Sequence, residues 1–186
     1  MTHTEMQALV EGYQKRNYTK VKRDDDAYQE TLDLTVSELQ RLLDMYRMQF
    51  TENQTARLIR DSIDHWIRRY HDYCIQGRIG SHYREVGVDE KDSIFEHVIP
   101  ASSVRDMLIE GRLTINQALN TPTCLIKKSS DKTLSSNGLV STSPNNWFFF
   151  RRYSVLNSSF ETYNGCPIVD INQHSLADHF KMFGIV

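Results

Sequence analysis

Ser93-Ile94-Phe95-Glu96-His97-Val98-Ile99-Pro100 lies near the middle of the chain, and its apolar and β-branched residues predict a strand over residues 93–99. Pro100 has no backbone N–H and ends this strand. Before it, Gly77, Gly80 and Gly87 mark the point where helical periodicity stops. After it, short strand-like runs alternate with short helices. The sequence therefore predicts an α+β fold, with a helical N-terminal half followed by a region of short strands and helices.

Two helices are predicted in the first half. Thr35-Val36-Ser37-Glu38 and Thr51-Glu52-Asn53-Gln54 each have the spacing of a capping box, in which a hydroxyl and a carboxylate or amide satisfy backbone N–H groups at a helix start. After the second box, apolar residues recur every three or four positions. These are Ala56, Ile59, Ile63, Trp66 or Ile67, Tyr70 and Tyr73. Because the two boxes are close in sequence, we expect an antiparallel helix pair.

The second half is predicted to hold short elements defined by their caps. The predicted helices run from Ser103 to Gly111, from Thr114 to Pro122, from Ser129 or Ser130 through Leu134, and from Ser175 to Phe183 with Gly184 as the stop. Two further strands are predicted, Thr123 to Lys127 and the aromatic run Trp147 to Tyr153. We divide the chain into a polar N-terminal arm (1–34), a helical region (35–90) and an α+β region (91–186).

Composition narrows the classes of protein to consider. The formal net charge of −2, from 22 Lys and Arg against 24 Asp and Glu, argues against a protein that coats nucleic acid by charge alone. Cys74, Cys124 and Cys166 are far apart and predict neither a zinc knuckle nor a disulfide framework. No apolar run approaches the roughly 20 residues that span a bilayer. We therefore expect a cytoplasmic protein with no membrane partner.

The pair Glu96-His97 at a strand end is the best candidate for chemistry. A histidine can act as a general base that takes a proton from an attacking water. The neighbouring carboxylate points to the other face of an extended strand, and a twist there would let it bind a hard divalent metal ion. The alternative is that His97 is simply hydrogen-bonded at the strand end and that Glu96 is solvated.

The segment Glu96-His97-Val98-Ile99-Pro100 resembles the first strand of the His-Me finger, or HNH, nuclease family, and in particular its phage members. Later motifs follow in the family's order: the apolar strand Thr123–Lys127, the acidic helix start at Asp131, Gly138-Leu139, Pro144-Asn145-Asn146-Trp147 and Arg152-Tyr153. The resemblance covers residues 93–153. It implies a ββα-metal core that holds a single divalent metal ion.

The resemblance also implies roles for individual residues. His97 is the expected general base, and Glu96 and Asp131 are the expected ligands of one Mg²⁺ or Mn²⁺ ion. Asp131 stands where the family usually has His or Asn, and Asp is a competent ligand for either ion. Asn120 is the nearest candidate for the middle Asn that orients the general base, although it falls early in the pattern, and Asn116 is the second candidate.

Arginines provide candidate phosphate contacts. Arg151 and Arg152 follow an aromatic run, and aromatic rings beside arginine can stack on bases. Arg68 and Arg69 lie on the polar face of the second helix. The competing interpretations are a core strand for the aromatic run and a solvated face with intrahelical ion pairs for the helix. For His174 and His179, capping or surface roles compete with a metal site.

Three functional hypotheses follow. The first is a metal-dependent endonuclease that hydrolyses DNA, in the host cytoplasm if the chain is phage-encoded. The second is an inactive protein on a degenerate HNH scaffold that binds nucleic acid or a host protein. The third is an interaction module in which helices over residues 35–76 pair with another chain and form a homodimer.

Overall fold

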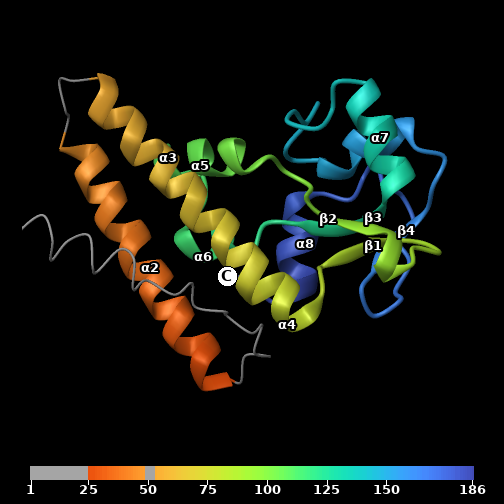
Figure 1. The fold of residues 1–186 in the computed structure, drawn as a ribbon, viewed down its shortest axis with the longest axis horizontal. Helices are drawn as coiled ribbons and strands as arrows, with labels where there is room; N and C mark the ends of the chain where they lie inside the picture. The colour runs from red at the N-terminus through yellow and green to blue at the C-terminus, as the bar shows by residue number, and fades with distance from the viewer. Residues whose placement is uncertain (1–24, 49–52) are drawn as a thin grey trace, which may run out of the picture.

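The structure is a computed structural model that describes residues 25–48 and 53–186 (Figure 1). The first described element is the long helix α2 (Asp25–Arg47), and α3 (Asn53–Tyr70) runs beside it in the opposite direction. This confirms the predicted antiparallel pair. Residues 1–24 of the expected arm and the start of the second capping box, at residues 51 and 52, lie outside the described residues.

The first capping box does not start a helix. Thr35 lies inside α2, where its side chain is buried and its hydroxyl donates to the carbonyl of Thr31 at 2.7 Å. Residues 25–34, which we expected in the polar arm, form the N-terminal part of α2. The capping spacing was misleading because a threonine hydroxyl can also bond to the carbonyl one turn earlier within a helix.

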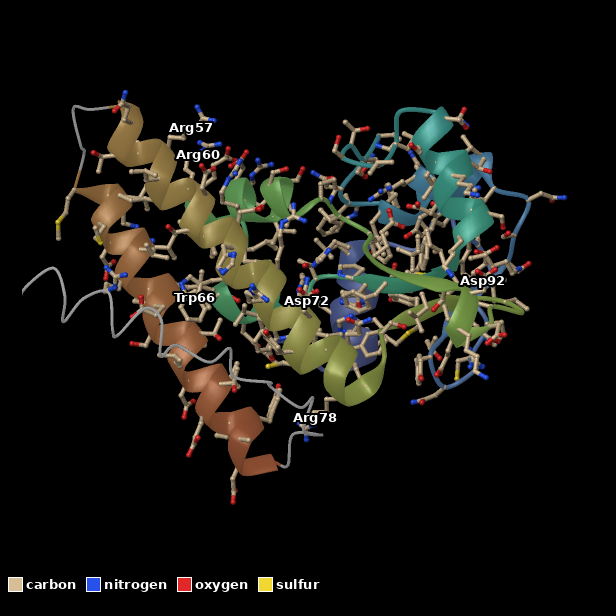
Figure 2. All side chains as sticks on the ribbon, viewed as in Figure 1. Arg57, Arg60, Trp66, Asp72, Arg78 and Asp92 are labelled. Carbon is tan, nitrogen blue, oxygen red and sulfur yellow. The ribbon has the colours of Figure 1, made fainter. Side chains whose placement is uncertain are left out.

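The apolar face of α3 was predicted correctly. Ile59, Ile63, Ile67 and Tyr70 are buried, and Trp66 packs against the core between the two helices (Figure 2). The helix continues as one π-helical segment, η1 (His71–Gln76), followed by the short α4 (Gly77–Ile79). A π-helical turn is uncommon and is often found near functional sites.

A small mixed sheet forms the second half. It contains β1 (Tyr83–Glu85), β2 (Ser93–His97), β3 (Thr123–Lys127) and β4 (Phe160–Thr162) in the order β2-β3-β1-β4. Strands β2 and β3 are antiparallel, with Glu96 opposite Cys124 and His97 opposite Thr123. Strand β1 is parallel to β3 and antiparallel to β4. The structure is therefore α+β with a helical first half, as predicted, and β2 lies at an edge of the sheet.

The connection from β2 to β3 is long and helical. It contains α5 (Ala101–Ile109) and α6 (Ile115–Leu119), and α5 packs on α3. Helix α6 begins with the predicted capping box between Thr114 and Gln117. A short 3₁₀ turn, η2 (Glu90–Asp92), leads into β2. After β3 the chain forms α7 (Lys128–Ser136), which lies against both strands of the β2–β3 pair (Figure 1).

The aromatic run was predicted wrongly as a strand. It is a 3₁₀ helix, η3 (Phe149–Val155), in which Phe149, Phe150 and Tyr153 are all buried. A strand would send alternate side chains to opposite faces, whereas here three aromatic rings enter the same core. The last helix, α8 (Leu176–Phe183), has its predicted Ser175 cap and ends at Gly184 in the left-handed conformation.

Two further predictions concern the chain as a whole. All three cysteines are free thiols; Cys74 and Cys124 are buried and Cys166 is exposed. Among residues 25–48 and 53–186, no helix combines the length and the apolar character needed to cross a membrane.

Candidate functional site

Glu96 lies in β2 and is almost enclosed, with 12% of its side chain exposed. The hydroxyl of Tyr153 donates to Glu96 Oε2 at 2.8 Å, and Arg152 Nη2 donates to Glu96 Oε1. Burial raises the pKa of the Glu96 carboxyl, and the nearby Asp131 carboxylate raises it further, while Arg152 and Tyr153 act in the opposite direction. The motif segments Glu96-His97 and Arg152-Tyr153 are thus in direct contact.

Arg152 is buried, with 1% of its side chain exposed. Besides Glu96, it donates to three backbone carbonyls: Nη1 to His97 O at 3.0 Å and to Val98 O at 3.1 Å, and Nη2 to Val140 O at 2.8 Å. The prediction that Arg152 contacts nucleic acid does not agree with this position. Its guanidinium is committed to the protein interior, where no phosphate can reach it.

Asp131 lies in the first turn of α7, on the helix that packs over β2 and β3. Its effect on the pKa of Glu96 shows that the two carboxylates share one neighbourhood. Mg²⁺ is commonly bound by one or two carboxylates together with waters and substrate phosphates, so this oxygen donor set suits it. Among the described residues, no three His, Cys, Asp or Glu side chains are grouped to hold a metal ion. The carboxylate pair therefore fits a metal in its chemistry, although both oxygens of Glu96 already accept hydrogen bonds.

His97 points away from Glu96, because successive side chains of a strand alternate. Its ring stacks on that of His71, which lies at the start of η1, with ring centroids 4.9 Å apart. Burial lowers the pKa of His97 to about 4, and the Arg68 guanidinium lowers it further. Its Nε2 atom is buried and has no hydrogen-bond partner. The twist that would bring Glu96 and His97 to one side is absent in this arrangement.

Asn120 is not directed at His97. Its side-chain amide donates to the carbonyl of Asn116 at 2.9 Å and to the Asn116 side chain at 3.0 Å, which closes the end of α6. Its backbone carbonyl accepts a hydrogen bond from His179 Nε2 at 2.8 Å. The expected catalytic role of Asn120 therefore has no geometric support, and Asn116 is occupied by the same contact.

The remaining candidate arginines are nearer the surface. Arg68 pairs with Asp64 at 2.8 Å, and the exposed Arg69 donates to the hydroxyl of Tyr73 at 3.3 Å. On the same helix, Arg57 and Arg60 lie where α3 passes α5 (Figure 2), and Arg60 pairs with Asp106 of α5 at 2.8 Å. These contacts favour the solvated face with ion pairs.

Arg151, from η3, is half-buried. It donates to the carbonyl of Asn172 at 3.1 Å and lies over the ring of Phe148 at 4.5 Å. Arg68, Arg69 and Arg151 therefore remain within reach of a phosphate, in contrast to Arg152.

Sequence reasoning missed a second buried cluster. The Tyr83 hydroxyl lies 2.9 Å from both His174 Nε2 and His179 Nδ1, and His82 Nδ1 lies 2.9 Å from the Thr123 hydroxyl. His179 is fully buried, which the expected capping or surface role did not anticipate. Asp178 does cap α8 through Ser175. These histidines join the C-terminal helix to β1 and β3.

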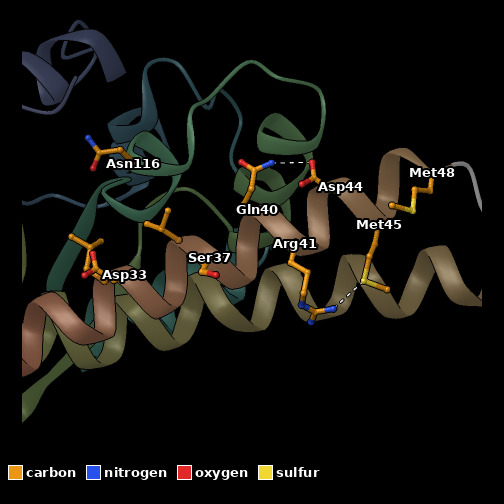
Figure 3. A pocket seen from close by; sticks show the side chains of 10 residues that line it. Asp33, Ser37, Gln40, Arg41, Asp44, Met45, Met48 and Asn116 are labelled. Carbon is orange, nitrogen blue, oxygen red and sulfur yellow. Dashed lines mark hydrogen bonds between the residues drawn. The ribbon is translucent and has the colours of Figure 1, made fainter.

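His71 was also missed, although a signal was present. It comes four residues after Ile67 and three before Cys74, which places it on the buried face of the helix. The helical region also contains an open groove along α2, with Asp33, Ser37, Gln40, Arg41, Asp44, Met45 and Met48 on one side and Asn116 on the other (Figure 3). Met48 is exposed beside it, as the homodimer hypothesis requires.

Comparisons of this chain with protein-family models, curated proteins and solved structures found no match. The resemblance to HNH nucleases therefore rests on the residues quoted above, and the function it implies is a proposal.

Proposed function

We propose that this protein is a metal-dependent endonuclease that hydrolyses DNA phosphodiester bonds. His97 is the general base, and Glu96 and Asp131 are the ligands of one Mg²⁺ or Mn²⁺ ion. When bound, such an ion would neutralise the scissile phosphate and stabilise the leaving oxygen. Arg68, Arg69 and Arg151 are the candidate contacts to neighbouring phosphates.

The observation that carries this proposal is the pairing of Glu96 with Asp131. They come from distant parts of the sequence, yet Asp131 raises the pKa of Glu96. The antiparallel β2–β3 pair followed by α7 supplies the order of elements that the resemblance implies. His97 follows Glu96 directly, at the end of the edge strand.

The protonation state of His97 is compatible with a general base. Because its pKa is lowered to about 4, the imidazole is neutral at pH 7 and can accept a proton. A base with so low a pKa is weak, and rotation toward solvent would relieve the burial that lowers it. The proposed activity therefore requires His97 to leave the ring of His71.

The test is cleavage of supercoiled and linear DNA by the purified full chain with Mg²⁺, Mn²⁺ or EDTA. We expect cleavage with either metal, none with EDTA, and none in His97→Ala or Asp131→Asn. Glu110→Gln is the matched control, because Glu110 is an exposed acid at the end of α5 and should be dispensable. No cleavage by folded protein with any metal would reject the proposal.

A second function is favoured by one specific observation. Both oxygens of Glu96 accept hydrogen bonds from Arg152 and Tyr153, as they would in a scaffold that has lost its metal. Under this alternative, the protein binds nucleic acid or a host protein without catalysis. It predicts equal DNA binding by the wild type and His97→Ala, measured by fluorescence anisotropy, with no cleavage by either protein.

A further inference from the structure

Arg152 links three segments that are distant in sequence. It lies in η3, and its donors reach the Glu96 side chain, two carbonyls at the end of β2 and the Val140 carbonyl in the segment after α7. Only Nε lacks a partner among its nitrogens. A buried arginine with this many acceptors is held firmly, since releasing one charged partner leaves the other unpaired in the interior.

Tyr153 completes the enclosure of Glu96. Its ring is fully buried and stacks on Phe160, with centroids 4.8 Å apart, which fixes the direction of its hydroxyl. That hydroxyl occupies Glu96 Oε2, while Arg152 occupies Oε1. A metal ion approaching from the Asp131 side therefore meets a carboxylate whose two oxygens are already hydrogen-bonded.

The same arginine also fixes the backbone next to Glu96. Its bonds to the carbonyls of His97 and Val98 hold the end of β2 in the extended form that directs His97 to His71. The twist needed to bring His97 and Glu96 to one side would break these bonds. One set of contacts thus keeps both proposed functional residues apart.

We propose that Arg152 and Tyr153 form an autoinhibitory latch on the Glu96–Asp131 metal site, and that a divalent cation binds Glu96 by displacing the Tyr153 hydroxyl. This inference rests on the proposed function and adds its regulation. Arg152 and Tyr153 act through Glu96 and the β2 backbone, so they are positioning residues. Weakening the latch should make the site easier to fill.

The direct test is Mn²⁺ binding to the full chain, measured by isothermal titration calorimetry and by electron paramagnetic resonance. Tyr153→Phe removes the hydroxyl and keeps the stacked ring. Removal of one competing hydrogen bond should lower the Kd for Mn²⁺ by about tenfold. Tyr163→Phe is the matched control, because the Tyr163 hydroxyl donates to Glu90 in the same way at a distance of 2.8 Å, away from Asp131. Asp131→Asn in the Tyr153→Phe background should abolish the tight binding.

The outcomes separate the latch from the site. Mn²⁺ binding that is equal or weaker in Tyr153→Phe overturns the latch and leaves the metal site intact. No binding to the wild type or to Tyr153→Phe overturns both the latch and the proposed metal site. If Tyr153→Phe does not fold, Arg152→Lys decides, because a shorter fork-less side chain should loosen Glu96 and also lower the Kd.

Discussion

The imidazole ring of His97 stacks on that of His71, with the centroids 4.9 Å apart and the planes inclined by 28°. Neither ring nitrogen of His71 has a hydrogen-bond partner, although the Leu119 carbonyl is close enough to raise the pKa of the ring. Burial has the larger effect and lowers the pKa of His71 well below its usual value. The lone pairs of two nearly parallel rings are themselves nearly parallel, so this pair is poorly arranged to share a metal ion.

Replacing His71 by phenylalanine should stabilise the protein. His71→Phe keeps a ring against His97 and removes two buried nitrogens that lack partners, so we expect the free energy of unfolding to rise by about 1 kcal/mol at pH 7. Urea denaturation measures the change. His71→Ala, which also removes the ring and leaves a cavity, should lower it by roughly 2 kcal/mol. A loss of stability in His71→Phe would show that the nitrogens bind a water or ligand in solution.

Stability should fall as the pH drops below about 6.5, the ordinary pKa of histidine. Burial lowers the pKa values of His71 and His82, and that of His179 to about 3. Between these values and about 6.5 the unfolded chain binds more protons than the folded protein, so acid favours unfolding. From pH 7 to pH 5.5 we expect each histidine to remove about 1.3 kcal/mol, or roughly 4 kcal/mol for the three.

Denaturant unfolding at pH 7 and pH 5.5 tests this expectation. His179→Gln cannot take up the proton, so the loss between the two pH values should shrink by about 1.3 kcal/mol. The exposed His65 of α3 provides the control, and His65→Gln should leave the loss unchanged. A pH-independent free energy of unfolding would mean that these rings gain compensating partners when protonated.

Local signals in the sequence predicted the elements that depend on local chemistry. The Thr114 and Ser175 capping boxes, the Gly184 stop and the buried stripe of α3 were all readable, because caps and periodicity act within a few residues. The aromatic run from Trp147 was misread, since a continuous apolar segment fits a buried strand or a buried helical turn equally well.

The candidate site depends on contacts that no local pattern encodes. The pair Glu96-His97 was found because it is contiguous, whereas the capping of Glu96 by Arg152 joins segments far apart in the chain. Arg152 was expected at the surface because isolated arginines usually are, and its burial required a carboxylate and carbonyls supplied by other elements.

The Tyr83 hydroxyl should be needed for the docking of α8. The Asn120 carbonyl can only accept, so His179 donates through Nε2, and its neutral Nδ1 accepts from Tyr83. Tyr83 in turn accepts from His174 Nε2. Tyr83→Phe leaves His179 Nδ1 unpaired, and we expect a loss of about 1–3 kcal/mol. Nitrogen-15 NMR of the wild type should show His174 and His179 both protonated at Nε2; an Nδ1-protonated His179 would contradict the chain.

Glu85 offers the sharpest test of a buried charge. It ends β1, and its carboxylate accepts from the hydroxyls of Ser130 at 3.0 Å and Ser158 at 2.7 Å, and from the backbone N–H of Lys127 at 2.9 Å. The Lys127 ammonium lies 3.2 Å away. Burial alone would raise the pKa of Glu85, but these donors together hold it below its ordinary value.

Glu85→Gln should therefore be destabilising despite its similar shape. It replaces one acceptor oxygen by an NH₂ group that meets other donors, and we expect a loss of about 2–3 kcal/mol in the free energy of unfolding at pH 7. The loss should shrink at acid pH, because a lowered pKa makes the wild-type contribution present at neutral pH and lost as the carboxylate is protonated. Glu161→Gln is the control, since Glu161 in β4 makes a more exposed pair with Arg84 and should change stability by less than about 1 kcal/mol. Equal effects of the two substitutions would show that the buried donors around Glu85 contribute no more than a surface pair.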